Sequence, residues 1–153
     1  MKWAIRAIGL ATAGLVGAPS LIAAFAPLWR HRRTPPYWQP LGAFQEFPVG
    51  EMREVVIQVA RQDWSETLRE KIVYAWRPTE QEAVVYSRSC TDLGCPLRWD
   101  PGSQCFFCPC HGGIFDKSGE RMAGPPAKPM YRYATRIING GIEIDLNSLP
   151  PMA

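Results

Sequence analysis

Residues 90–95 read Cys-Thr-Asp-Leu-Gly-Cys and residues 105–113 read Cys-Phe-Phe-Cys-Pro-Cys-His-Gly-Gly, and together they contain all five cysteines of the chain. The Cys-x-x-Cys and Cys-x-x-His spacings place two soft ligands on one tight loop, as thiolate-binding metals require. Two such loops that face each other can hold one metal centre. A plain disulfide would use some of these cysteines, but it does not account for five of them beside one of only two histidines. The stretch therefore predicts a metal site.

On either side of these loops, the sequence alternates with the period of β-strands. Apolar residues occupy every second position from 55 to 59 and from 72 to 76, and residues 83–86 form a short apolar run. Turn-forming residues fill 100–103 and 117–120, and residues 139–141 separate two alternating segments as in a hairpin. The body is therefore predicted to be mostly antiparallel β, a small sandwich or barrel that carries the cysteine-rich loops as an insert.

The N-terminal end has a different character. Residues 7–29 are 23 consecutive positions without a formal charge, and basic residues flank them on both sides. A helix that rises about 1.5 Å per residue could cross a hydrocarbon core of about 30 Å with this length. We therefore expect one N-terminal transmembrane helix, with residues 1–33 as a membrane anchor. A cleaved signal peptide is the alternative, because Ala24-Phe25-Ala26 resembles a cleavage site.

Residues 34–44 contain three prolines and no usable period, so they are predicted to form a stiff, extended tether between the anchor and a domain at 45–153. The whole chain has 153 residues, which is room for one compact domain and a short accessory segment. A hydrophobic fraction of 46% excludes wholesale disorder.

The net charge of +3 belongs to the N-terminal end. Up to Arg33 there are five basic residues and no acidic ones, which leaves 12 basic against 14 acidic residues in the rest of the chain. A basic body that binds nucleic acid is therefore disfavoured, and no nucleic-acid partner is expected.

The two cysteine-containing segments closely resemble the two boxes of the Rieske iron-sulfur proteins of cytochrome bc and related complexes, which read Cys-Thr-His-Leu-Gly-Cys and Cys-Pro-Cys-His-Gly-Ser. The resemblance extends to the anchor, the tether, the β body and residues 124–129, Gly-Pro-Pro-Ala-Lys-Pro, which look like the proline loop that shields the cluster in that family. It implies a Rieske-type fold, a cluster-binding part at about 88–130, and a 2Fe-2S cluster as cofactor.

The same resemblance implies the roles of individual residues. Cys90 and Cys108 would be thiolate ligands of the inner iron, and His111 would be a ligand of the outer iron. Cys95 and Cys110 would form the disulfide that pins the two loops together. Because a disulfide implies an oxidising compartment, the domain is expected on the extracytoplasmic side of the cell membrane.

Three positions depart from the family pattern, and all three act in the same direction. Asp92 stands where the family has its first histidine ligand, and we expect its carboxylate to complete the metal-binding set. Gly113 replaces a serine and Phe115 replaces a tyrosine, which removes two hydrogen bonds to the cluster and its ligands. Rieske potentials are high, roughly −150 to +300 mV, because neutral histidines replace thiolates. An anionic ligand and fewer hydrogen bonds therefore predict a low-potential centre.

The resemblance also implies a function. We expect a membrane-anchored Rieske subunit of a quinol:cytochrome oxidoreductase, with cytochrome b-type and cytochrome c-type subunits as partners. The low potential favours menaquinol as the quinol. His111 would be the catalytic residue that accepts the quinol proton, since an imidazole titrates near physiological pH. Residues 33–40 would be the hinge on which the domain moves toward its cytochrome.

Three alternatives remain open from the sequence. Asp92 could mark a degenerate site, with the domain kept as a structural or assembly subunit that has no working cluster. A zinc site could use Cys90, Cys105, Cys108 and His111. A soluble Rieske ferredoxin that serves an oxygenase would share the boxes without needing the anchor. Cys105 otherwise fits no position of the family and is expected to be a small buried residue.

Overall fold

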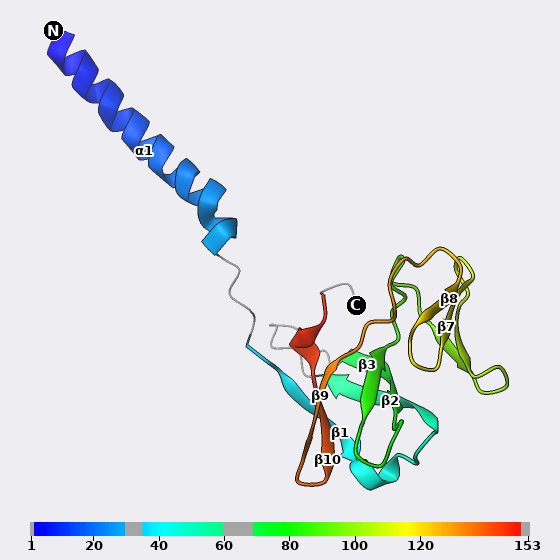
Figure 1. Ribbon diagram of the computed structural model, residues 1–153. Coiled ribbons are helices and arrows are strands. Elements are labelled where there is room, and N and C mark those ends of the chain that lie inside the picture. The colour runs from blue at the N-terminus through cyan, green and yellow to red at the C-terminus, as the bar shows by residue number, and fades with distance from the viewer. Residues whose placement is uncertain (1, 30–34, 60–68, 151–153) are drawn as a thin grey trace. The chain divides into compact units, whose positions relative to one another are not determined.

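The computed structural model describes residues 2–29, 35–59 and 69–150, and the chain divides into two units at Thr34–Pro35. The described residues of the first unit form one helix, α1 (Lys2–Trp29) (Figure 1). Its helical conformation agrees with the long uncharged stretch that the sequence shows at residues 7–29.

The prediction that this helix crosses a membrane is not supported. In the described parts of the chain, no helix is both long enough and apolar enough to span a bilayer. The basic residues expected to end the anchor, at 30–33, lie outside the described residues.

The second unit contains three antiparallel sheets, as the alternating sequence predicted (Figure 1). Their strand orders are β1-β10-β9, β2-β3-β4 and β5-β6-β7-β8. The strands are β1 (Trp38–Ala43), β2 (Met52–Val59), β3 (Arg69–Trp76), β4 (Val84–Ser87), β5 (Arg98–Asp100), β6 (Cys105–Cys108), β7 (Gly113–Asp116), β8 (Arg121–Ala123), β9 (Ala134–Ile138) and β10 (Gly141–Asp145). Two short 3-10 helices, Phe44–Glu46 and Leu146–Ser148, follow β1 and β10.

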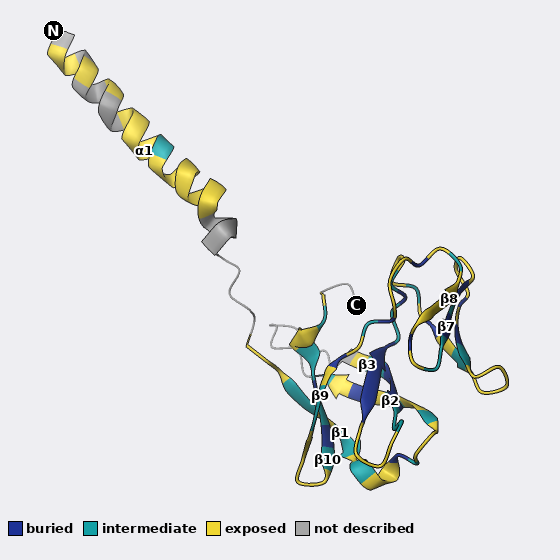
Figure 2. Ribbon diagram, viewed as in Figure 1, coloured by how far each residue is buried: buried dark blue, intermediate teal, exposed yellow. Residues whose placement is uncertain are grey.

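The sheet β2-β3-β4 contributes to two hydrophobic cores, one on each face. Alternate residues of β3 and β4, such as Val73 and Val85, pack with Ile142 and Ile144 of β10. The intervening residues, Tyr74, Val84 and Tyr86, pack with Phe106 and Phe115 of the four-stranded sheet. This explains why residues 83–86 are continuously apolar: both faces of β4 are buried (Figure 2).

Most of the segment predicted as a tether belongs to the first sheet. Residues 38–43 form β1, which pairs with β10 from Trp38↔Asp145 to Ala43↔Gly141. Just before it, the Tyr37 amide donates to Asp145 Oδ1 at 2.8 Å and Asn147 Nδ2 donates to the Pro35 carbonyl at 2.7 Å. The prolines did not prevent pairing because β1 is an edge strand, where a missing N–H can face solvent.

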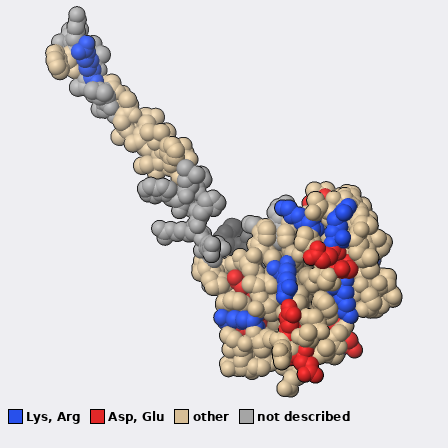
Figure 3. All heavy atoms as spheres, viewed as in Figure 1, with Lys and Arg blue, Asp and Glu red and all other residues tan. Residues whose placement is uncertain are grey.

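The β9–β10 hairpin turns at the expected place. Asn139 and Gly140 have φ values of 51° and 73°, the left-handed pair that a two-residue hairpin turn requires. Arg136 and Glu143 pair across the hairpin, with Nε 2.7 Å from Oε2. Figure 3 shows acidic and basic side chains interspersed over one face of this unit.

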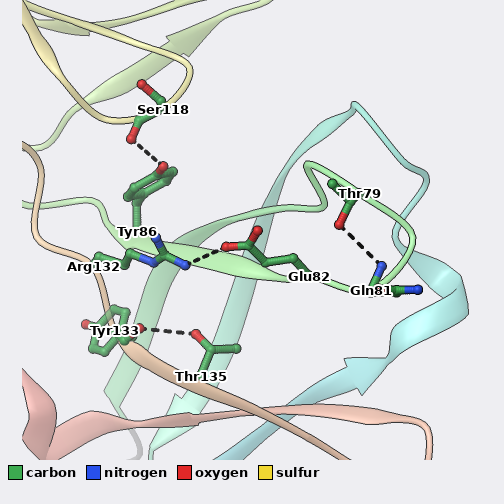
Figure 4. Close-up of polar contacts among 8 residues, drawn as sticks. All are labelled: Thr79, Gln81, Glu82, Tyr86, Ser118, Arg132, Tyr133 and Thr135. Carbon is green, nitrogen blue, oxygen red and sulfur yellow. Dashed lines mark hydrogen bonds and ion pairs between the residues drawn. The ribbon is translucent and has the colours of Figure 1, made fainter.

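The four-stranded sheet is tied to the rest of the unit through its β7–β8 turn. The Tyr86 hydroxyl of β4 donates to the Ser118 carbonyl at 2.6 Å (Figure 4). Next to it, the Lys117 ammonium bonds the Gly50 carbonyl and Gln104 Oε1, the latter at 3.0 Å. Burial raises the pKa of Tyr86 to about 12, so this hydroxyl stays protonated and able to donate.

Candidate metal centre

The first cysteine-containing loop, residues 90–95, is a tight turn that follows β4. The Cys90 amide donates to the Cys95 carbonyl at 2.8 Å, and the Gly94 amide donates to the Cys90 carbonyl at 3.0 Å. Gly94 has a φ of 72°, a conformation that a residue with a side chain adopts only with strain. These bonds hold Cys90 and Cys95 at the two ends of one turn.

The second loop, residues 108–113, joins β6 to β7 and repeats this geometry. The Gly112 amide donates to the Cys108 carbonyl at 3.0 Å, and Gly112 also has a φ of 72°. Each loop therefore begins with a cysteine whose carbonyl is bonded by a glycine four residues later. The cysteine side chains at the start of the two loops meet inside the domain.

Cys90 and Cys108 form a buried pair of thiols at this meeting point. Each residue is 1% exposed, and both belong to the core beneath the four-stranded sheet. Burial raises the pKa of the Cys90 thiol, and its hydrogen bond with Cys108 raises it further. Thiolates in this place would need a nearby positive charge, which a bound metal supplies.

Asp92 and His111 meet at the exposed side of the same two loops. His111 Nδ1 lies 3.0 Å from Asp92 Oδ2, and the two side chains are 45% and 28% exposed, respectively. They are 19 residues apart in sequence, so the contact depends on the two loops lying face to face. One oxygen donor and one nitrogen donor therefore lie side by side at the exposed side of the loops.

A disulfide joins the two loops. Cys95 and Cys110 are bonded to each other, as the family resemblance implied. The sulfur of Cys108 lies within 4.8 Å of both disulfide sulfurs. The bond therefore fixes the second loop against the first, next to one of the two buried thiols.

Residues 124–129 close over this arrangement. The Pro126 ring is fully buried against Gly113, so close that a Cβ placed on Gly113 would be 2.7 Å from Pro126 Cγ. On the first loop, the Thr91 hydroxyl donates to the Lys128 carbonyl at 2.9 Å. The segment thus covers both loops, in agreement with its resemblance to a shielding proline loop.

The packing around Gly113 leaves little room for a side chain, and Phe115 belongs to the core. A serine at Gly113 would collide with Pro126 unless the proline segment moved. Phe115 is fully buried in the core below the loops, where a hydroxyl would need a partner of its own. The packing of the proline segment therefore accounts for glycine at position 113.

Cys105 lies apart from these donors. Its Sγ is 3.3 Å from the Ser103 carbonyl and 3.7 Å from Met122 Sδ, in the β5–β6 turn and β8. It is partly exposed, which corrects the expectation of a buried residue. Ser103 and Met122, the neighbours of the Cys105 sulfur, lie outside the two loops, so nothing favours Cys105 as a fourth ligand of a zinc site.

The donor set suits a two-iron cluster by its chemistry. Two buried thiols are soft ligands for one iron, and an exposed imidazole with an exposed carboxylate can serve a second iron nearer the surface. The sequence had indicated all six loop residues, and the structure brings them together in three pairs: Cys90 with Cys108, Asp92 with His111 and Cys95 with Cys110. It had not indicated roles for Thr91, Gly94 or Gly112. The position of each glycine, four residues after its cysteine, could have predicted the two glycines, whereas no pattern predicted Thr91.

Comparison with known proteins agrees with this geometry. The Rieske [2Fe-2S] domain model matches residues 37–140, about two thirds of the chain. The menaquinol:cytochrome c reductase iron-sulfur subunit of Geobacillus thermodenitrificans is 27% identical over 104 residues, 60% of this chain and 62% of that protein. The subunit of the same name from Bacillus subtilis is 33% identical over 81 residues, 50% of this chain and 48% of that protein. The chain thus spans less than two thirds of the length of these relatives.

Among solved structures, a naphthalene 1,2-dioxygenase with indole bound superposes with a TM-score of 0.54 at 16% identity, covering 76% of this chain and 28% of that one. At this identity the likeness concerns the fold alone. The family model, the fold and the paired loops lead to one conclusion: the chain belongs to the Rieske [2Fe-2S] domain family, whose cofactor is a 2Fe-2S cluster.

Proposed function

We propose that this chain is the Rieske subunit of a quinol:cytochrome oxidoreductase and that its quinol is menaquinol. The names of the Geobacillus and Bacillus relatives support the general role. The observation that carries the proposal is that these loops carry two buried thiols, Cys90 and Cys108, and an exposed contact of Asp92 Oδ2 with His111 Nδ1, which together make four donors.

The four donors divide by burial. Cys90 and Cys108 would hold the inner iron, because their buried thiolates need its positive charge. Asp92 and His111 would hold the outer iron through Oδ2 and Nδ1, the two atoms that face each other at the exposed side of the loops. This arrangement keeps the thiolates away from water and leaves the imidazole accessible.

One-electron redox chemistry between a quinol and a cytochrome is what a bound 2Fe-2S cluster supplies. The role of His111 follows from its position. Its Nδ1 faces Asp92, so its second nitrogen, Nε2, lies on the opposite edge of a ring that is 45% exposed. An exposed imidazole nitrogen can form a hydrogen bond with a quinol hydroxyl and accept its proton.

The ligand set supports a low potential. A carboxylate adds one negative charge where a histidine would add none, which makes the uptake of an electron less favourable. Gly113 and Phe115 offer no side-chain hydrogen bonds that would stabilise the reduced state. A low-potential acceptor suits a low-potential quinol, which is the reason for choosing menaquinol.

The disulfide supports a location on the extracytoplasmic side of the membrane, because such bonds persist in oxidising compartments. There the domain would work with a cytochrome b-type subunit, which binds the quinol, and a cytochrome c-type subunit, which receives the electron. Since residues 35–43 are bonded to the sheet, a hinge at 33–40 is not part of the proposal.

An iron count combined with electron paramagnetic resonance and a redox titration tests the proposal. We expect two irons per chain, a rhombic signal after reduction with dithionite, and a midpoint in the lower part of the Rieske range of roughly −150 to +300 mV. A midpoint near the top of that range would contradict the low-potential assignment.

The contact of Asp92 with His111 also favours a second candidate, a structural subunit without a cluster. Because the two side chains already satisfy each other, they need no metal to be paired. The same experiment separates the candidates: a chain without iron and without a signal after reduction would support the structural subunit.

A further inference from the structure

The sulfurs of Cys95, Cys108 and Cys110 lie close to one another where the two loops meet. Cys108 Sγ is within 4.8 Å of both sulfurs of the Cys95–Cys110 disulfide. Cys108 is buried and carries a free thiol, whereas Cys110 is exposed. A thiol beside a disulfide is the arrangement from which thiol–disulfide exchange starts.

We propose that in the cluster-free protein the Cys108 sulfur attacks Cys95 of the disulfide, so that a Cys95–Cys108 bond replaces Cys95–Cys110. One S–S bond forms and one breaks. The Cys108 thiol gives up its proton as its sulfur attacks, and Cys110 leaves as a thiolate that takes up a proton. No oxidant or reductant is consumed. The inference rests on the proposed role of Cys108 as an iron ligand, which keeps its sulfur engaged when the cluster is present.

The direction of attack follows from the positions of the two disulfide sulfurs. Attack on Cys110 would join two cysteines separated only by Pro109, a ring too short for the usual disulfide geometry. Attack on Cys95 links two separate loops and releases Cys110, which is exposed and whose thiolate water can stabilise. Cys95 is therefore the electrophilic sulfur and Cys110 the leaving group.

The exchange and the cluster exclude each other because both use the Cys108 sulfur. Loss of the cluster converts an inner ligand into half of a disulfide and exposes a new thiol, Cys110, at the surface. The chain would then be unable to take up a cluster until the exchange is reversed. The position of the disulfide therefore differs between the cluster-bound protein and the cluster-free protein, with no net oxidation or reduction.

Two matched variants isolate the attacking sulfur. Both are made in a Cys105→Ala background, because Cys105 is a partly exposed free thiol that would also take up the label. Cys90→Ala and Cys108→Ala each delete one proposed ligand, but only Cys90→Ala keeps the sulfur that attacks. The parent Cys105→Ala protein, before and after iron is removed with a chelator in native buffer, completes the set.

The experiment measures which cysteines carry each of two alkylating labels. Thiols are alkylated with one reagent in the folded protein and with a second reagent of different mass after unfolding. Trypsin leaves residues 89–98 joined to residues 99–117 in either disulfide state, since no lysine or arginine lies between Cys105 and Cys110. Fragment ions that separate Cys108 from Cys110 therefore identify the bonded cysteine.

We expect the folded-state label on Cys110 to be roughly tenfold or more higher in Cys90→Ala than in Cys108→Ala, because only the former can release this thiol. The chelated parent should behave like Cys90→Ala and the iron-loaded parent like Cys108→Ala. A Cys95–Cys110 bond that persists in the chelated parent would overturn the proposal, even if both variants failed to fold.

The iron content of the untreated parent keeps this test separate from the proposed function. If the untreated parent contains no iron, the proposed function fails, and its own disulfide map then tests the exchange directly. A Cys95–Cys108 bond in that iron-free chain would support the exchange, and a Cys95–Cys110 bond would contradict it.

Discussion

The two loops of the metal centre share a backbone and differ in the side chain that each presents. In residues 90–95 and in residues 108–113, the opening cysteine accepts a hydrogen bond from a glycine four positions later, and both glycines have a φ of 72°. The first loop presents a carboxylate, Asp92, and the second an imidazole, His111. Because the backbones match, the chemical asymmetry of the site comes from these two side chains.

The loops also differ in how they are held. The first is bonded to the proline segment through the Thr91 hydroxyl and to the second loop through the disulfide. The second is packed under Pro126, and the β7–β8 turn that follows its strand is bonded to Tyr86 and to Gly50. The imidazole therefore sits on the loop that the buried proline ring covers.

The largest expected effect comes from breaking the feature that the loops have in common. Cys90→Ala removes one of the two buried thiols and should abolish cluster binding, measured as iron and acid-labile sulfide per chain. Cys105→Ala is the matched control, because its sulfur lies against Ser103 and Met122, and it should keep its cluster. Equal iron in the two variants would contradict the assignment of Cys90.

The next effect comes from separating the two loops. The double variant Cys95→Ala/Cys110→Ala removes the disulfide, whose cysteines are 15 residues apart. The free energy of unfolding should fall by about 3 kcal/mol, because the unfolded chain loses a constraint of that length. Denaturant titrations should be made in a Cys108→Ala background, where no neighbouring thiol can exchange. An unchanged free energy would show that the loops hold together without this bond.

Making the loops alike should have a smaller effect. Asp92→His replaces the carboxylate by a second imidazole and should raise the midpoint potential by roughly 100 mV, which corresponds to about 2.3 kcal/mol. Asp100→Asn, which removes a carboxylate on the β5–β6 turn, is the control and should change the midpoint little. The assignment of Asp92 as a ligand would be wrong if its variant kept the original midpoint.

The smallest effect tests the support of the second loop. Burial raises the pKa of Tyr86 to about 12 in the folded protein, against 10.0 for the free group. A raised folded pKa means that stability is complete below the unfolded value and declines as pH rises toward the folded one.

Between about pH 9 and pH 11, wild type should therefore lose about 1 kcal/mol more than Tyr86→Phe, which cannot ionise at this position. Denaturant titrations of both proteins across this range measure the difference. Tyr74, whose pKa burial also raises to about 12, contributes equally to both proteins and cancels. Parallel pH profiles would contradict the role given to the Tyr86 hydroxyl.

The sequence predicted the strands well because burial on one or both faces leaves a direct trace in the pattern of apolar residues. It failed at β1, where pairing with β10 depends on an edge position that the prolines of residues 35–40 do not reveal. The membrane anchor expected at residues 1–33 stays a prediction, because no helix of the described residues meets the length and apolarity of a membrane span.

At the site, the resemblance to the Rieske family predicted which cysteines are bonded to each other, whereas the expectation that Cys105 is buried was wrong. It could not predict that Asp92 reaches His111, because that contact depends on how two loops 19 residues apart are oriented. Nor could it show that Pro126 packs on Gly113, since the spacing of prolines does not determine how closely a segment lies on its neighbour.

The central claim is that one carboxylate and one imidazole hold the outer iron. Pulsed electron paramagnetic resonance of the reduced protein, labelled with ¹⁵N-histidine, counts the histidine nitrogens that are bonded to the cluster. We expect one strongly coupled nitrogen, retained in a His31→Ala variant and therefore assigned to His111. Two coupled nitrogens, or none, would contradict the account.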